Sequence, residues 1–480
     1  MNDLELVGLD ATQAVSMLHR GDLGAQEYVG SLLRALDHHA GLHAMTHVDP
    51  DVVRAAAQRA DDIPARSRGP LHGLPMIVKD NIDVAGMPCT AGSPALAHHR
   101  PARDADCVAP LRAAGALVLG KSNLHEFALG VTSGNAAYGA VRNPHAPGRI
   151  AGGSSGGTAA AIAARLAPVG LGTDTGGSIR IPAALCGVVG FRPSTGRWPS
   201  RGVVPISVPT RDTAAPMARS VLDCALLDAV VCGDDPALAT LSPRGLRLGL
   251  PREFWTDLHG GLAHQLRGAL DALASAGVEL VPMAMEVDLA AIGQVGLTIA
   301  MAENLPALRA YFADHALPFD IHRLAAAIAS PDVRGIFGHL AQGSAPDAAT
   351  YAAALAEVRD RLQPAWASVL TRHALDALVM PTTPLPAARI GEDDVVQMDG
   401  RRWPTFDTYV RHCGPATILG LPSLSLPAGC VAEQGDALPV GLMLDGPRGG
   451  DRRLLAIGAA LQPLLPPTPT PTPTTTPDTQ

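Results

Sequence analysis

The first half of the chain alternates short apolar runs with stretches of helical periodicity. Three runs have the length and apolar content of buried strands: LPMIV at 74–78, AGALVLG at 114–120 and APVGLGTDT at 167–175. The stretches CVAPLRAAG and TAAAIAARLA show the apolar spacing expected of helices. Strands that alternate with helices predict an α/β fold whose sheet is covered on both faces.

Helical periodicity also marks the start of the chain and its second half. Residues 10–37 predict two amphipathic helices interrupted at RGDLG, with Asp10 or Thr12 as an N-cap. The stretch 262–277 places its leucines on one face of a helix that stops at a glycine. Residues 288–375 are rich in alanine and mostly helical in pattern. Further strands are expected at VELVPM, DALVMP and PVGLML.

The end of the chain has a different composition. From Pro466 it reads PPTPTPTPTTTPDTQ, which offers nothing apolar to bury. Segments of this kind remain extended and unfolded. We therefore expect residues 1–465 to form one domain and residues 466–480 to be a disordered tail.

Composition and charge restrict the class of partner. The chain has 480 residues, 47% hydrophobic and 17% charged, which is enough for a large core. Its net charge is -8, and it has no block of Lys and Arg, which argues against nucleic acid or an anionic membrane as a partner. No apolar run approaches about 20 residues, so no membrane span is expected.

The cysteines and the N-terminal sequence bear on cellular location. None of the seven cysteines has C-x-x-C spacing, which is typical of free thiols in a reducing compartment. The sequence MNDLELVGLDATQAVSMLHRG lacks the charged start and apolar core of a signal peptide. We therefore expect a cytoplasmic protein.

Two short motifs match functional patterns that imply different chemistries. GALVLGKS at 115–122 fits the phosphate-binding loop of nucleotide hydrolases. Its middle residues 116–119 are apolar, however, and predict a buried strand rather than a loop around a phosphate. GGSSG at 152–156 fits the nucleophile elbow of α/β-hydrolases, with Ser154 as the nucleophile.

Glycine and serine are dense in two segments, IAGGSSGGTAAAIAA at 150–164 and GTDTGGSIRIPAALCG at 172–187. Glycines allow positive φ, and successive backbone N–H groups can hold an anion such as the oxyanion of a tetrahedral intermediate. A single segment of this kind is more often a flexible turn. Two of them, each with a central serine, favour a catalytic site.

A nucleophilic serine needs a base, and Lys79 is the unusual candidate. It directly follows the strand LPMIV, where desolvation would lower the pKa of the amine. On local sequence alone, an ion pair with Asp80 or Asp83 is the simpler alternative, although strand alternation puts Asp80 on the opposite side. The chain has 17 histidines, so a histidine base also stays open, but none lies in a marked pattern.

Four motifs together resemble the amidase signature family. In order, they are GLPMIVKDNIDVAGMPCTAGS, GKSNLHEFALG, NPHAPGRIAGGSSGGTAAAIAA and GTDTGGSIRIPAALCGVVGFRPSTGR. The resemblance covers residues 5–460 and is strongest from 70 to 220. It implies the amidase signature fold, with a large central mixed β-sheet covered by helices on both faces. It also makes GKSN the end of a structural strand.

The resemblance further implies a Ser–Ser–Lys triad. By motif, Ser178 in TDTGGSIR is the nucleophile, and Ser154, which in the family follows a cis peptide bond, is the bridging serine. Lys79 is the base. All three residues are present, so the chain is expected to be active.

The same resemblance assigns the surroundings of the nucleophile. The backbone N–H groups of Thr175, Gly176, Gly177 and Ser178 correspond to the oxyanion hole, and Ser155 would support the relay by hydrogen bonding. Asp174 and Arg180 flank the nucleophile, and we interpret them as residues that fix the loop before we assign them any contact with substrate.

The sequence indicates the substrate less clearly than it indicates the triad. The stretch FRPSTGRWPSRGVVPISVPTRDTAAPMARSV looks more like free-standing hydrolases of aryl-substituted acetamides, such as indoleacetamide and mandelamide hydrolases, than like the glutaminase subunit of tRNA-dependent amidotransferases. The expected activity is cleavage of small aryl- or alkyl-substituted amides through an acyl-enzyme. Anilides, esters and carbamates (urethanes) are compatible, because only the leaving group changes. The glutaminase subunit is the alternative.

Several residues are candidates for contacts with the substrate. Thr132 and Ser133 are plausible contacts for the amide end, with Ser155 beside them. Four aromatic residues could line an apolar wall: Phe337, Trp403, Phe406 and Tyr409. For each of these four, an ordinary place in the core is an equal alternative.

We expect no cofactor and no metal site, since the chain has neither H-E-x-x-H nor a Cys/His cluster. A homodimer is compatible with the sequence. Two other classes remain as alternatives, an α/β-hydrolase with Ser154 as its nucleophile and a binding module without catalysis.

Overall fold

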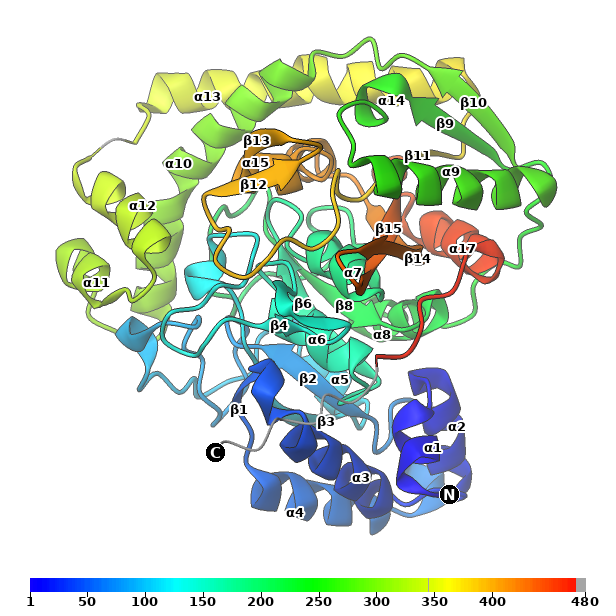
Figure 1. The fold of residues 1–480 in the computed structure, drawn as a ribbon. Helices are drawn as coiled ribbons and strands as arrows, with labels where there is room; N and C mark the ends of the chain where they lie inside the picture. The colour runs from blue at the N-terminus through cyan, green and yellow to red at the C-terminus, as the bar shows by residue number, and fades with distance from the viewer. Residues whose placement is uncertain (344, 472–480) are drawn as a thin grey trace.

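The computed structural model describes residues 1–343 and 345–471, and its centre is an 11-stranded mixed sheet (Figure 1). The strand order is β1-β3-β2-β6-β8-β7-β14-β15-β11-β9-β10. Parallel pairs join β3 to β2 to β6 at one end and β11 to β9 to β10 at the other, and the strands between them are antiparallel. The strands are β1 (Met45–His47), β2 (Pro75–Lys79), β3 (Leu117–Ser122), β6 (Val169–Asp174), β7 (Val189–Arg192), β8 (Thr213–Ala218), β9 (Arg247–Pro251), β10 (Glu279–Met283), β11 (Ala377–Pro381), β14 (Ser423–Glu433) and β15 (Asp436–Asp445). The predicted α/β architecture with a mixed sheet is confirmed.

Helices cover both faces of this sheet. α6 (Gly156–Ala163) packs with α7 (Arg180–Cys186), and α8 (Val221–Cys232) packs with α17 (Asp451–Leu461). Both pairs contact the middle strands β7, β8 and β14. α6 and α7 are buried along their whole length, which explains why their sequences GGTAAAIA and RIPAALC are mostly small or apolar. The one charged residue, Arg180, is paired with Asp174.

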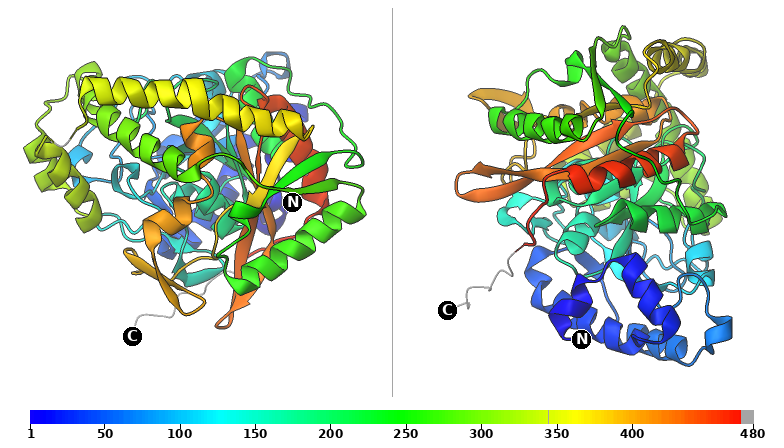
Figure 2. Two further views of the ribbon diagram at one scale, coloured as in Figure 1. Left: turned by 90° about the horizontal axis from the view of Figure 1, so that it is seen from above. Right: turned by 90° about the vertical axis from the view of Figure 1, so that its right-hand side faces the viewer.

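The N-terminal helices lie at one end of the molecule, and β9 and β10 lie at the other (Figures 1 and 2). The expected helix pair is present as α2 (Ala11–Arg20) and α3 (Ala25–His38), preceded by α1 (Asp3–Gly8) and followed by α4 (Pro50–Asp61). Asp10 is the N-cap of α2, and its backbone N–H donates to Gln13 Oε1 at 3.1 Å. α2 ends at Gly21, whose φ of 78° is the left-handed conformation that glycine adopts without strain.

The segment that matches a phosphate-binding loop is a strand. Gly120, Lys121 and Ser122 belong to β3, which pairs with β2 on one side and β1 on the other. Lys121 is fully buried, and its Nζ lies 3.2 Å from Asp80 Oδ1 and donates to the carbonyl of Ile82 at 2.7 Å. The backbone is therefore committed to the sheet and cannot wrap a phosphate.

The helical part of the second half lies along one side of the molecule (Figures 1 and 2). It comprises α10 (Leu289–Asp314), α11 (Ile321–Ala327), α12 (Pro331–Ala341), α13 (Ala348–Glu357), a π-helical turn (Val358–Leu362) and α14 (Gln363–Arg372). The expected helices at 288–375 are thus present. α9 (Gly260–Ser275) and α5 (Ala109–Ala113) also form where helices are predicted.

Two small hairpins lie outside the main sheet. They pair β12 (Val395–Met398) with β13 (Arg401–Pro404), and β4 (Arg142–Asn143) with β5 (Ala146–Ile150). Two short helices, α15 (Thr405–Val410) and α16 (Gly414–Ile418), follow β13 along the chain. Among the described residues, no helix is both long and apolar enough to cross a membrane.

The first residues of the Pro/Thr-rich segment lie against the body of the protein. Arg165 Nη2 donates to Thr470 Oγ1 at 3.0 Å, and a side chain placed on Gly187 would meet Thr468. Residues 472–480, which belong to the expected disordered tail, lie outside the described residues.

Candidate active site

Lys79 ends β2 in a fully buried position. Its Nζ lies 2.7 Å from Ser154 Oγ and 2.7 Å from Thr173 Oγ1. The simpler alternative, an ion pair with Asp80 or Asp83, is wrong. Asp80 pairs with Lys121. Asp83 accepts a hydrogen bond from the Tyr311 hydroxyl, and its Oδ2 lies 2.8 Å from His315 Nε2.

Burial lowers the pKa of Lys79 well below its ordinary value, because a charged ammonium loses its hydration in this position. The charges of Asp174 and Asp212 act in the opposite direction and raise it in part. The amine can therefore be neutral under conditions in which an exposed lysine is charged, as a general base must be.

Ser154, the partner of Lys79, lies next to the residue that contacts the second glycine-rich segment. The peptide between Gly153 and Ser154 is cis, and the Ser154 side chain is fully buried. The next residue bridges the two segments, because the Ser155 N–H donates to the carbonyl of Ser178 at 3.0 Å. Ser154 is not among the cavity-lining residues described below, so the geometry does not favour the nucleophile-elbow interpretation.

Ser178 lies two residues before the start of α7 and is 8% exposed. It lines a large cavity, as do Thr175 and Gly176. Gly177 has a φ of 126°, and a Cβ at this position would lie 2.6 Å from Cys413 Cβ. Glycine is therefore required for the chain to turn tightly into the nucleophile.

Asp174 fixes the loop between β6 and the nucleophile. Its carboxylate accepts from the backbone N–H of Gly177 at 2.9 Å and of Ile179 at 3.2 Å, and it forms buried ion pairs with Arg180 and Arg192. The charge of Arg180 holds the pKa of Asp174 below its usual range, against the opposing effect of burial. These contacts agree with the interpretation of Asp174 and Arg180 as residues that fix the loop. Because Gly177 N–H is taken by Asp174, the N–H groups of Thr175, Gly176 and Ser178 are the better candidates for an oxyanion hole.

The cavity next to Ser178 has a volume of about 1070 Å³ and mostly apolar walls. Residues 128–131 form one wall, and α10, α12, α15 and α16 supply the others. Three of the apolar side chains in the lining are notably exposed: Leu297 at 64%, Phe406 at 53% and Ile336 at 40%. A site of this size and character accepts an organic ligand with a large apolar part.

Of the four aromatic candidates for the apolar wall, only Phe406 lines the cavity. Phe337 packs on Phe127 in the core, because α12 directs Ile336, His339 and Leu340 toward the cavity instead. Tyr409 is buried and donates its hydroxyl to the carbonyl of Pro386 at 2.8 Å. Trp403 lies beneath the guanidinium of Arg411 at 5.9 Å. For these three residues the other alternative left open by the sequence, ordinary packing in or against the core, holds.

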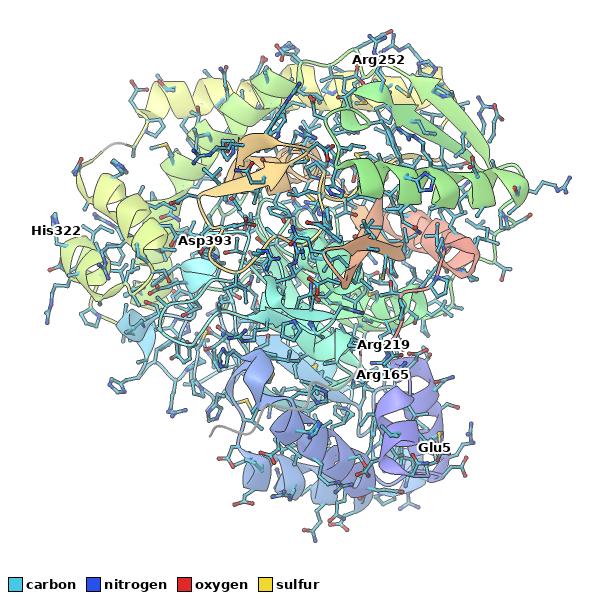
Figure 3. The ribbon with its side chains drawn as sticks, in the orientation of Figure 1. Glu5, Arg165, Arg219, Arg252, His322 and Asp393 are labelled. Carbon is cyan, nitrogen blue, oxygen red and sulfur yellow. The ribbon has the colours of Figure 1, made fainter. Side chains whose placement is uncertain are left out.

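The predicted polar contacts with substrate lie beside the cavity lining rather than in it. Thr132 donates to Asp393 Oδ1 at 2.6 Å, and Figure 3 marks Asp393 below α12 and the β12–β13 hairpin. Ser133 Oγ donates to the carbonyl of Ser154 at 3.3 Å, and Ser155 Oγ donates to the carbonyl of Thr173 at 3.1 Å. The hydroxyls of Ser133 and Ser155 thus brace the segments that carry Ser154 and Thr173, whereas that of Thr132 holds Asp393. A direct role of any of the three in binding substrate stays a prediction.

Three residues near the site were not singled out from the sequence. Thr173 is the second partner of Lys79. Arg211 lines the cavity and donates to the carbonyl of Thr175 at 2.8 Å. Asp212 accepts from Thr175 Oγ1 at 2.7 Å. Thr173 could have been found from the sequence, because it lies on a predicted strand that runs into the glycine-rich loop. Strand alternation directs its side chain to the opposite face from that of its neighbour Asp174. Nothing local marks the other two, because they approach from a separate loop.

Two clusters elsewhere bring together side chains of the kinds that bind metals. Asp83, His99 and His315 form one, and Asp228, Cys232 and Asp234 form the other. In the first, the Tyr311 hydroxyl lies between the groups, 2.7 Å from Asp83 Oδ1 and 2.9 Å from His99 Nε2. In the second, Arg197 contacts both carboxylates.

Comparisons with known proteins agree with this geometry. The family model "Amidase" matches residues 27–455. The chain is 40% identical to an indoleacetamide hydrolase of Agrobacterium vitis over 94% of its own length and 96% of the relative, and 37% identical to a mandelamide hydrolase of Pseudomonas putida over 95% and 91%. The structure resembles native peptide amidase from Stenotrophomonas maltophilia with a TM-score of 0.82 and 31% identity, over 97% of this chain and 99% of that one. The chain therefore belongs to the amidase family and is an amide-hydrolysing enzyme.

Proposed function

We propose that the protein is a serine hydrolase that cleaves the C–N bond of small aryl- or alkyl-substituted amides through an acyl-enzyme on Ser178. The observation that carries this proposal is the buried contact of 2.7 Å between Lys79 Nζ and Ser154 Oγ, with Ser178 held next to Ser155 at the floor of an apolar cavity.

The relay has a consistent direction. Neutral Lys79 takes the proton of Ser154, Ser154 takes the proton of Ser178, and Ser178 Oγ forms a bond to the carbonyl carbon. The carbonyl oxygen becomes an oxyanion, which backbone N–H groups of the nucleophile loop stabilise. When the C–N bond breaks, the relay runs in reverse and protonates the departing amine. Water then adds to the acyl-enzyme by the same route and releases the acid.

The cavity supports an aryl or alkyl acyl group. Its apolar lining suits a ring or chain, and the relatives in Agrobacterium vitis and Pseudomonas putida are named for amides with aromatic acyl groups. Anilides, esters and carbamates belong to the same proposal, because the relay acts on any leaving group that accepts a proton.

The alternative is the glutaminase subunit of an amidotransferase. With the side-chain amide of glutamine at Ser178, the charged α-ammonium and α-carboxylate groups would lie in the cavity, and its largely apolar walls offer these groups few partners. The alternative also needs a second chain to consume the ammonia.

A hydrolysis panel tests the proposal. Phenylacetamide, indoleacetamide, glutamine, an anilide and an aryl carbamate are offered to the purified protein, with Ser178→Ala and Lys79→Ala as controls. We expect turnover of aryl substrates, loss of activity in both variants, and an acyl adduct on Ser178 by mass spectrometry. Cleavage of glutamine alone, or full activity in Ser178→Ala, would overturn the proposal. The position of the adduct separates the elbow alternative, since there the acyl group would be found on Ser154 and would still form in Ser178→Ala.

Expectations about location, cofactors, partners and assembly belong to the same proposal. We propose that the enzyme works in the cytoplasm, without a cofactor, on a small-molecule amide and without nucleic acid. A homodimer is tested by light scattering during gel filtration.

A further inference from the structure

Arg211 lies where the acyl cavity meets the nucleophile loop. It lines the cavity, and its Nη2 donates to the carbonyl of Thr175 at 2.8 Å. Its Nη1 donates to the carbonyl of Gly296 on α10 at 2.9 Å. Within the part of the chain that the structure describes, its guanidinium has no carboxylate at ion-pair distance, and its buried Nε has no hydrogen-bond partner. The side chain as a whole is half-buried, and the carboxylates of Asp212, Glu303 and Asp174 favour its charged form without forming an ion pair with it. The unpartnered, buried Nε is the feature that calls for an explanation.

The loop that carries Arg211 is held on several sides. Asp212 accepts from the backbone N–H groups of Ile206 and Ser207 at 2.7 and 3.0 Å. Glu303 on α10 accepts from Ser207 Oγ at 2.6 Å and from Thr210 Oγ1 at 2.7 Å. The guanidinium of Arg211 is therefore presented by a rigid support.

This loop forms hydrogen bonds with Thr175 at two points. Arg211 holds its carbonyl, and Asp212 accepts from its hydroxyl at 2.7 Å. The peptide between Thr175 and Gly176 is trans, so its carbonyl and its N–H point in opposite directions. A hydrogen bond that fixes the carbonyl of Thr175 therefore also fixes the N–H of Gly176. A Cβ placed on Gly176 would lie 3.9 Å from Arg211 Nη2, which shows how closely the guanidinium approaches this peptide.

We propose that Arg211 is a positioning residue of the hydrolysis: it holds the Thr175–Gly176 peptide in one orientation and so aligns the Gly176 N–H with the developing oxyanion. The inference rests on the proposed acyl-enzyme at Ser178 and adds to it a residue that acts through the backbone. Its contribution belongs to the transition state, because the oxyanion forms only there.

The test separates binding from chemistry. Arg211→Leu is compared with wild type for kcat and KM on phenylacetamide, and for inhibition by two probes. Phenylacetaldehyde accepts Ser178 Oγ at its carbonyl carbon and gives a tetrahedral adduct whose oxygen occupies the oxyanion position. Phenylacetic acid is planar at the same carbon and reports binding of the ground state.

We expect kcat to fall by about 10- to 100-fold, the range set by a misplaced or weakened oxyanion donor. The affinity for the aldehyde should fall by a similar factor, while KM and the inhibition constant of the acid change by no more than about threefold. Arg211→Lys keeps the charge and can hold one carbonyl, so it should recover part of kcat. Unchanged kcat, or equal losses for both probes, would overturn the inference.

Two controls protect this comparison. Arg68 is a matched arginine, since its Nη1 donates to the carbonyls of Leu18 and His19 at 2.9 and 2.8 Å, away from the cavity, and Arg68→Leu should keep wild-type kcat. If Arg211→Leu does not fold, Arg211→Gln takes its place with the same expectation, because it keeps a polar group in the buried position. Full activity in Ser178→Ala would contradict the proposed function itself. If Ser178→Ala is inactive and the folded Arg211 variants keep wild-type kcat, only this inference is contradicted.

Discussion

The environment of Lys79 combines two opposing effects on one amine. Burial favours the neutral form, and the carboxylates of Asp174 and Asp212 favour the charged form. The two acids differ in compensation. Asp174 forms ion pairs with Arg180 and Arg192, whereas Asp212 accepts only from Thr175 and from backbone N–H groups. Replacing Asp212 should therefore change the pKa of Lys79 with less damage to the fold than replacing Asp174 would cause.

Asp212→Asn should move the acid limb of the pH–activity profile to lower pH. Activity rises with pH as Lys79 loses its proton, and removal of a nearby negative charge lowers the pKa at which this occurs. The measurement is kcat/KM for phenylacetamide across the neutral and alkaline range. Asp104→Asn, at a carboxylate paired with Arg112 outside the site, should leave the limb in place. A limb shifted to higher pH would contradict the assignment of Lys79 as the base, and so would a wild-type optimum clearly below about pH 6.

At the scale of single elements, α12 and α15 decide which aromatic residues meet the substrate. Phe406 on α15 is 53% exposed and lines the cavity, whereas Phe337 on α12 is fully buried against Phe127. The two residues have the same chemistry and were equal candidates from sequence. They should therefore give opposite results when truncated.

Phe406→Ala should raise KM for phenylacetamide, by about tenfold if most of the ring contact is lost, with little change in Tm. Phe337→Ala should leave KM close to wild type and lower the free energy of unfolding by about 3–5 kcal/mol, because it opens a cavity in the core. Kinetics together with urea denaturation distinguish the two. A large loss of stability in Phe406→Ala would show that its ring is part of the core after all.

The elements that sequence reasoning found are those whose pattern is local. β2, β3 and β6 are runs of apolar residues bounded by polar ones, and they form close to where they are predicted, although β3 extends through Lys121 and Ser122. β8 reads TAAPMA, which is too weak in large apolar residues to be noticed. The face that α12 turns to the cavity could not be predicted, because Ile336 and Phe337 are adjacent and both apolar.

The residues of the site also divide into those that local motifs reveal and those that only tertiary contacts bring together. The candidates Lys79, Ser154 and Ser178 came from motifs, and the structure brings Lys79 to Ser154 and places Ser155 against Ser178. The approach of Arg211 to Thr175 depends on the pairing of β8 with β6, which sets Thr213 opposite Asp174 and so brings the residues before β8 to the nucleophile loop. No pattern along the chain encodes that kind of contact.

At the scale of the whole molecule, the two clusters of metal-binding types of side chain lie outside the catalytic cavity. The Tyr311 hydroxyl occupies the space between Asp83 and His99, and Arg197 neutralises Asp228 and Asp234. Dialysis against EDTA should therefore leave both kcat and Tm unchanged. A fall in Tm that Zn²⁺ restores would show that one of the clusters binds metal, and the Asp83→Asn variant would identify which.

The sheet also predicts how the molecule unfolds. β14, from the end of the chain, lies between β7 of the first half and β15, so the hydrogen-bonded ladder joins both halves. Neither half can lose its strands without exposing an edge of the other. We therefore expect one cooperative transition and not two.

Tryptophan fluorescence tests this with two separate probes. Trp198 is buried in the first half, where its indole N–H donates to Asp228 Oδ1 at 2.9 Å, and Trp366 is buried on α14 in the second half. Variants that keep only one of these, with the other tryptophans replaced by Phe, should give urea midpoints that coincide with each other and with the loss of enzymatic activity. Two separated midpoints would mean that the pairing of β7 with β14 is too weak to couple the halves. Coincident midpoints would mean that the Ser178 loop, which lies between β6 and β7, depends for its stability on a strand formed by the last sixty residues of the chain.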